Sequence, residues 1–179
     1  MKKLFLVLMF CLMIAGCYFH PRSPADFPTQ LKTVYFAPER EFSTLAIQLR
    51  ALLKSMDVRC VKNPSDATYT LKITHDYFSY TRADVVDATL PSTMSFTQVA
   101  TISVIDNRNT KVLVSQLFSS SNTVILNANQ VYTASSNDLI RQELNHNLIS
   151  LIYYWLISMN TKNAIAHANN AKTIVHASR

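Results

Sequence analysis

The sequence predicts an α+β domain in which two helices pack on one face of a four-stranded, mostly antiparallel or mixed sheet. Residues 39–56 and 135–157 repeat apolar residues with the period of a helix, whereas residues 68–80 and 92–118 alternate with the period of a strand. The order strand, helix, strands, helix favours both helices on one side of the sheet. A chain of 179 residues has the length of one such domain.

Residues 1–16 have the features of a secretory signal peptide. Lys2 and Lys3 precede an apolar run from Leu4 to Ala15, which is too short for a membrane span of roughly 20 residues. The run ends in Ile14-Ala15-Gly16-Cys17, which fits the bacterial lipobox. Cys17 is therefore the predicted lipidation site and the first residue of the mature chain. An ordinary signal peptide with a chance cysteine is the alternative.

Residues 17–31 are expected to form a lipidated N-terminus and an extended tether, because Pro21, Pro24 and Pro28 disfavour helices and sheet pairing. The predicted single domain then covers residues 32–159. It opens with a strand at residues 32–37, rich in β-branched and aromatic residues and ended by Pro38.

Residues 39–56 are expected to form the first helix. Glu39 and Glu41 at its start and Lys54 near its end complement the helix dipole. Its apolar stripe is expected to face the domain core, with partner binding as the alternative. The stripe contains Phe42, Leu45, Ala46, Leu49, Leu52, Leu53 and Met56.

The segment 58–61 is predicted to be an edge strand or the lead-in to one, and residues 63–66 form a turn. Residues 68–80 then alternate as a half-buried strand. Lys72 lies on its polar face, and His75 is expected to be a hydrogen-bonded core histidine rather than a catalytic one. The predicted buried face carries Tyr69, Leu71, Ile73, His75 and Tyr77.

Residues 92–104 and 111–118 are predicted to pair as a hairpin, with an asparagine of the turn 106–109 in the left-handed conformation. Residues 119–122 interrupt the second strand, which indicates a bulge. The buried face of the first strand is expected to hold Met94, Phe96, Ala100, Ile102 and Val104. Asp84 and Asp87 precede this hairpin in a solvated loop.

The last helix is expected to begin at Ser135 or Ser136, with a core stripe of Ile140, Leu144, Leu148, Leu151 or Ile152, and Trp155. From residue 148 to 157 it is apolar on nearly all sides, which is more than one sheet face covers and indicates a partner protein or lipid. Tyr154, with Tyr153 or Ile157 beside it, is the candidate partner interface. Residues 160–179 are rich in Asn and Ala and are expected to form a disordered tail.

Composition excludes several classes of function. Loss of Lys2 and Lys3 with the signal lowers the formal charge from +6 to +4, and the remaining basic residues are scattered, so no nucleic-acid partner is expected. Gly16 is the only glycine, which excludes glycine-rich phosphate loops. Cys60 is expected to be a buried structural thiol. We find no catalytic constellation and no metal-ligand spacing, so the sequence predicts neither an enzyme nor a metal or cofactor site.

Three segments resemble one protein family and occur in the same order along the chain as in that family. Cys17-Tyr18-Phe19-His20-Pro21-Arg22 resembles the start of the mature LPS-assembly lipoprotein LptE family, with departures at Tyr18 and Pro21. Residues 28–36 are similar to the lead-in and first strand of that family. Residues 129–131 and 135–144 are similar to its last helix and the segment before it.

This resemblance implies a lipid-anchored protein on the periplasmic side of the cell outer membrane. It would assist assembly of the LPS-transport barrel LptD, plug the lumen of that barrel and help to deliver lipopolysaccharide to the outer leaflet. Lys72 and Arg82 are the candidate contacts to lipopolysaccharide phosphates. The alternative is a lipoprotein pilot or scaffold of another envelope machine, with no lipid ligand.

Overall fold

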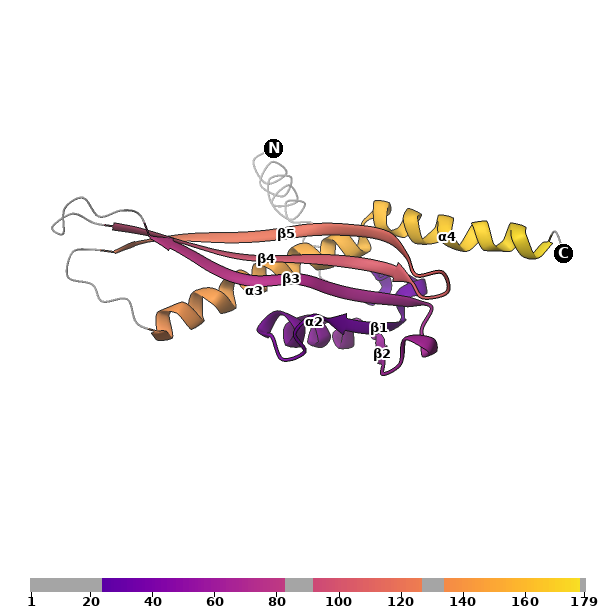
Figure 1. Cartoon of the computed structure of the whole chain (residues 1–179), viewed down its shortest axis with the longest axis horizontal. Helices are drawn as coiled ribbons and strands as arrows, with labels where there is room; N and C mark the ends of the chain where they lie inside the picture. The colour runs from indigo at the N-terminus through magenta and orange to yellow at the C-terminus, as the bar shows by residue number, and fades with distance from the viewer. Residues whose placement is uncertain (1–23, 83–91, 127–133, 178–179) are drawn as a thin grey trace, which may run out of the picture.

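A computed structural model of the chain describes residues 24–82, 92–126 and 134–177. The signal peptide, Cys17, His20, Asp84 and Asp87 lie outside these ranges. Figure 1 shows how the strands and α-helices are arranged. The strands are β1 (Thr33–Pro38), β2 (Arg59–Val61), β3 (Tyr69–Arg82), β4 (Ser92–Asp106) and β5 (Lys111–Leu126). The α-helices are α2 (Thr44–Ser55), α3 (Ala134–Ile157) and α4 (Met159–Ala177).

The strands form one mixed sheet in the order β2-β1-β3-β4-β5. β1 pairs in parallel with β2 and β3, whereas β3–β4 and β4–β5 are antiparallel. The α+β class and the mixed sheet are confirmed, but the numbers of elements differ from the prediction. The short segment at residues 59–61 is a full member of the sheet, and the chain after residue 158 adds a third helix.

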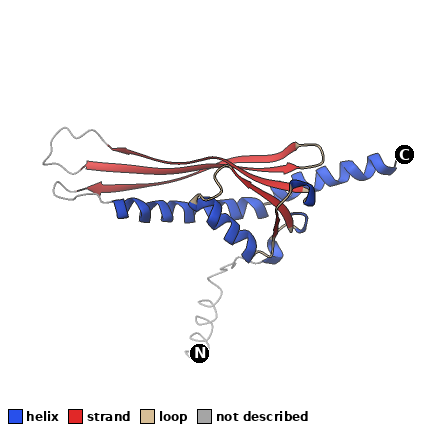
Figure 2. Cartoon of the chain, turned by 60° about the horizontal axis from the view of Figure 1, so that its bottom comes forward, coloured by secondary structure: helices blue, strands red, loops and turns tan. Residues whose placement is uncertain are grey.

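Helices α2 and α3 lie together on one face of the sheet (Figure 2). The inner face of α2 is wholly buried at Leu49 and Leu53, and that of α3 at Leu148 and Ile152. These side chains join the inward residues of β1, β3 and β4 in one core. All five residues predicted for the buried face of β4 are indeed buried.

The first helix begins at Thr44, five residues later than predicted. The Oγ atom of Ser43 accepts a hydrogen bond from the Ala46 backbone N–H at 3.1 Å and so caps the helix N-terminus. Phe42 therefore precedes the helix and is 88% exposed, contrary to its predicted place in the core stripe. The other six residues of that stripe are buried.

A bulge interrupts β3 and was not predicted. Thr74 pairs with Thr101 and Tyr77 with Val99, so His75 and Asp76 oppose a single residue of β4. His75 has φ 54°, and its backbone N–H donates to Glu39 Oε2 at 2.8 Å. The bulge shifts the alternation by one residue, so His75 and Tyr77 are exposed and Asp76 is buried. The prediction of a core histidine is therefore wrong.

Strand β5 is continuous through residues 119–122, which pair with β4 in regular register. The predicted interruption there is wrong. The register shift between these strands lies instead near the turn, between Val104 and Ile105. In the turn itself Thr110, not an asparagine, has the positive φ of 55°.

Both ends of the described chain extend the domain beyond residues 32–159. Phe27 and Leu31, which the sequence places in an extended tether, are buried beside short 3₁₀ turns. The segment predicted to be a disordered tail forms α4, and Ile165 of this helix is wholly buried. Figures 1 and 2 show α4 running past the β4–β5 turn. Within the described ranges, no helix combines the length and the apolarity that a membrane span requires.

Candidate ligand groove and partner surfaces

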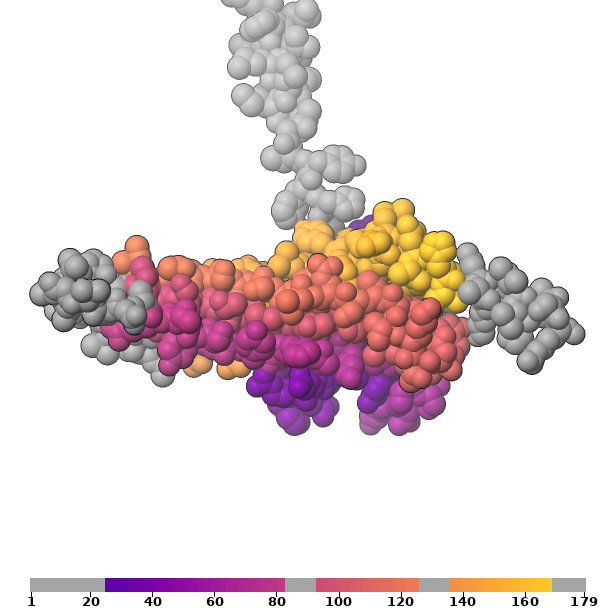
Figure 3. All heavy atoms as spheres, turned by 45° about the horizontal axis from the view of Figure 1, so that its top comes forward, coloured from indigo at the N-terminus to yellow at the C-terminus, as the bar shows by residue number. Residues whose placement is uncertain are grey.

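The face of β3, β4 and β5 opposite the helices is lined mainly by hydroxyl groups, and we call it the open face. Figure 3 shows atoms of these strands at the surface on this side. Ser95 and Thr123 lie 3.3 Å apart through their hydroxyl oxygens, and Ser103 and Ser115 lie 2.7 Å apart. Tyr77, Leu117 and Ile125 add exposed apolar side chains. The exposed or half-exposed polar side chains of the open face are Lys72, Thr74, Ser79, Thr81, Thr93, Ser95, Thr97, Thr101, Ser103, Ser115, Ser119, Ser121 and Thr123.

The predicted ligand residues Lys72 and Arg82 are both exposed, but they lie on opposite faces of the sheet. Lys72 pairs with Ser103 on the open face, whereas Arg82 pairs with Met94, which is buried on the helix side. The bulge causes this separation, because ten residues of regular strand would leave both side chains on one face. Along the strand they are also about 30 Å apart. The two residues therefore do not form one compact site.

The outer side of α3 carries only part of the predicted partner interface. Tyr154 is 57% exposed, as predicted for an outward contact, and Leu151 beside it is 47% exposed. Tyr153 is 1% exposed and belongs to the core, so it is removed from the candidate interface. Ile157 is partly buried against the same core. Trp155, predicted for the core, is partly buried with its ring centroid 5.6 Å from that of Phe118.

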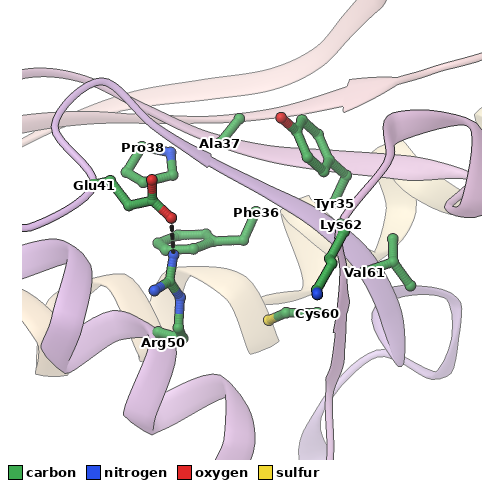
Figure 4. A pocket seen from close by; sticks show the side chains of 9 residues that line it. All are labelled: Tyr35, Phe36, Ala37, Pro38, Glu41, Arg50, Cys60, Val61 and Lys62. Carbon is green, nitrogen blue, oxygen red and sulfur yellow. Dashed lines mark ion pairs between the residues drawn. The ribbon is translucent and has the colours of Figure 1, made fainter.

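A groove opens beside β1 where β2 ends, and sequence reasoning did not find it. β2 pairs only with the first three residues of β1, so in the described part of the chain the last three have no strand neighbour on that side. The cavity there has a volume of about 630 Å³. Figure 4 shows the side chains that line it. They are Tyr35, Phe36, Ala37, Pro38, Glu41, Arg50, Cys60, Val61 and Lys62.

The groove holds two cationic side chains and one carboxylate. Arg50 Nη2 lies 3.5 Å from Glu41 Oε1, and the guanidinium carbon lies 5.4 Å from the centroid of the Phe36 ring. These contacts place the guanidinium at the wall of the groove. Lys62 follows β2 directly and is exposed. The groove therefore has an excess of one positive charge, together with apolar surface.

Cys60 lines the same groove as a free, half-buried thiol. Burial raises the pKa of the Cys60 thiol above its ordinary value, while the positive charge of Arg50 lowers this pKa by a smaller amount. The thiol is therefore neutral and weakly nucleophilic at neutral pH.

A buried polar layer divides the interior under the long strands. Gln98 Nε2 donates to Asp76 Oδ1 at 2.7 Å, and both residues are buried. The remaining oxygen of Gln98 and the Oδ1 atom of Asn145 are buried with no hydrogen-bond partner. Along β4 and α3, the residues after Gln98 and Asn145 belong to the large core. The residues before them belong to a small cluster of Met94, Phe96 and Leu144. No group of three or more metal-ligating side chains occurs within residues 24–82, 92–126 and 134–177.

Comparison with known proteins identifies no family model that matches and no curated protein that matches. Solved structures do match. Lipoprotein B from Nitrosomonas europaea, described as uncharacterized, has a TM-score of 0.52 and 13% identity, over 84% of this chain and 97% of that one. A protein from Helicobacter pylori, described as a neuraminyllactose-binding hemagglutinin homologue, has a TM-score of 0.54 and 10% identity, over 83% of this chain and 96% of that one. The rare lipoprotein B of Shewanella oneidensis has a TM-score of 0.48 and 12% identity, over 75% of this chain and 98% of that one.

What these proteins share with the chain is the fold. The match to the Nitrosomonas europaea protein includes nearly all of its length, so the fold is that of a solved bacterial lipoprotein. At these identities the likeness is limited to the fold.

Proposed function

We propose that this chain is an outer-membrane lipoprotein, anchored through Cys17 on the periplasmic side, and is a binding protein rather than an enzyme. It assists assembly of an LptD-like β-barrel, plugs the lumen of that barrel and helps to deliver lipopolysaccharide to the outer leaflet. The lipobox, the ordered resemblance to the LptE family and the lipoprotein fold support this proposal.

The open face is the observation that supports it best. The lumen wall of a membrane barrel is polar and wet. Hydroxyl groups both donate and accept hydrogen bonds, so the Ser and Thr side chains of this face can pair with either kind of group on such a wall. Apart from Lys72, the polar members of the open face carry no charge that would have to lose its hydration. Leu151 and Tyr154 on α3 offer a second, apolar contact surface.

Affinity isolation of the native lipidated protein from the cell envelope tests the proposal. We expect one large outer-membrane β-barrel to co-purify. Co-purification of a secretin or a secretion ring would instead favour the alternative, a pilot or scaffold lipoprotein with no lipid ligand.

A pair of variants tests the role of the open face. Ser79→Glu with Ser121→Glu adds two carboxylates at exposed positions of one cross-strand row. Hydrated charges there should weaken capture of the barrel, because contact would strip their water. Asn160→Glu with Asn163→Glu adds the same charge at exposed positions of α4 and is the control. Equal capture by both variants would contradict the proposed contact face.

A further inference from the structure

The groove beside β1 combines features that a small anionic ligand requires. Its volume of about 630 Å³ lies within the range of roughly 300–1,000 Å³ that is typical of ligand sites. Arg50 and Lys62 approach it from two different elements, α2 and the end of β2. Tyr35, Phe36 and Val61 supply apolar surface between them.

Two contacts orient the Arg50 guanidinium toward the groove when no ligand is bound. The guanidinium lies over the Phe36 ring, and Glu41 holds one of its nitrogen atoms. A guanidinium has five N–H donors, so one ion pair leaves most of them available to a ligand. Arg presents these donors in a planar fork that matches a phosphate, and Lys adds a mobile point charge.

We propose that this groove binds a phosphate group through Arg50 and Lys62, with the apolar part of a phosphate-bearing amphiphile resting on Tyr35, Phe36 and Val61. The phosphate offsets the excess positive charge of the groove. The inference concerns the isolated chain and requires no barrel partner, so it can fail or succeed independently of the proposed function.

Cys60 provides a reporter inside the groove. Its alkylation by the neutral reagent iodoacetamide is measured in the full-length chain, with the modified residue located by peptide mass spectrometry. A bound phosphate covers the thiol and neutralises Arg50, whose charge favours the reactive thiolate. Both effects slow the reaction. We therefore expect a several-fold fall in the rate of Cys60 alkylation when the site is saturated.

Three probes distinguish the source of the phosphate. They are inorganic phosphate, a short-chain phosphatidic acid below its micellar concentration, and phosphatidylcholine with the same acyl chains. Protection by phosphate and phosphatidic acid supports a general phosphate site, and protection by phosphatidic acid alone supports a lipid head group. Protection by all three equally, or by none, would overturn the proposal.

Variants test the two cations. Arg50→Gln with Lys62→Gln should weaken phosphatidic acid binding about tenfold or more and abolish protection, because each charged contact is lost. Lys111→Gln with Lys162→Gln removes the same charge away from the groove and should keep protection. Arg50→Lys retains the charge and should keep part of the protection. The rate of Cys60 alkylation is compared with and without ligand within each variant, because Arg50 itself affects the thiol. Undiminished protection in the folded Arg50→Gln, Lys62→Gln variant would show that these two residues do not form the phosphate site.

Discussion

Within residues 24–82, 92–126 and 134–177, three residues other than glycine adopt a left-handed backbone conformation, namely Asp57, His75 and Thr110, with φ between 54° and 59°. Glycine normally occupies such positions because a Cβ atom is strained there. At the end of α2, Asp57 N–H donates to the Lys54 carbonyl at 3.1 Å, and Val58 N–H donates to the Leu53 carbonyl at 2.9 Å. This is a Schellman motif built without glycine. The hydrogen bonds around each site offset the strain of a side chain in this conformation.

We predict that Asp57→Gly and Thr110→Gly each stabilise the protein. Removing the Cβ atom relieves about 1 kcal/mol of backbone strain, partly offset by the entropy that glycine gains in the unfolded chain. Thermal or urea unfolding of the purified chain measures the change. Ala51→Gly in the exposed middle of α2 is the control and should lower stability by about 1 kcal/mol. A loss of stability in all three variants would contradict the assigned strain.

At the scale of the element, α3 shows how a helix can be apolar nearly all round without a membrane. It contacts β4 and β5 on one side and α2 on another, and the chain continues into α4 at its end. Leu148, Ile149, Ile152, Tyr153 and Leu156 are buried by these neighbours. The apolar surplus expected to need a partner is therefore largely covered within the chain, and Leu151 and Tyr154 are what remains on the surface.

The neighbouring residues Tyr153 and Tyr154 should respond oppositely to truncation. Tyr153→Ala removes a buried ring and should lower the unfolding free energy by about 3–5 kcal/mol. Tyr154→Ala removes an exposed ring and should change stability little while weakening capture of the barrel partner. Melting curves and pull-downs of both variants provide the measurements. Unfolding caused by Tyr154→Ala alone would mean that the helix is rotated from this arrangement.

The buried polar layer makes α3 less stable than an apolar helix of the same shape. Asn145 is 1% exposed and its Oδ1 atom has no partner. Asn145→Leu, which keeps the branching of the side chain, removes this buried acceptor and should raise the unfolding free energy by about 1–2 kcal/mol. Asn147→Leu, at an exposed position of the same helix, should change it little. A destabilised Asn145→Leu variant would indicate that the amide makes a necessary hydrogen bond.

At the scale of the whole molecule, the sheet separates two surfaces. The helices cover one face, and the other remains open and rich in hydroxyl groups along the long strands (Figures 2 and 3).

Lipidation is the first property to test at this scale. Mass spectrometry of the mature protein should show cleavage before Cys17 and several acyl chains on it, since one chain gives only marginal membrane binding. Cys17→Ala should abolish the acyl mass and release the protein from the membrane fraction. A wild-type chain without acyl groups would contradict the lipoprotein assignment.

The separation of Lys72 and Arg82 predicts different effects for the two residues. Lys72→Glu changes the open face, and Arg82→Glu changes the helix side at the far end of β3. If lipopolysaccharide phosphates bind on the open face, Lys72→Glu should reduce crosslinking to lipopolysaccharide several-fold and Arg82→Glu should not. Unchanged crosslinking in the folded Lys72→Glu variant would remove Lys72 from the candidate site.

The sequence by itself determined the α+β class, the inward face of β4 and most of the α2 stripe, because these depend on local periodicity. It also contains a sign of the β3 bulge, because the apolar residues that face the core change from Leu71 and Ile73, at odd positions, to Phe78, at an even one. Tertiary structure alone decided which neighbour buries each side of α3 and whether Tyr153 or Trp155 enters the core. It also assembled the groove, since Arg50 and Lys62 come from elements that meet only when β2 pairs with β1. Contacts between distant segments leave no periodicity in the chain from which they could be predicted.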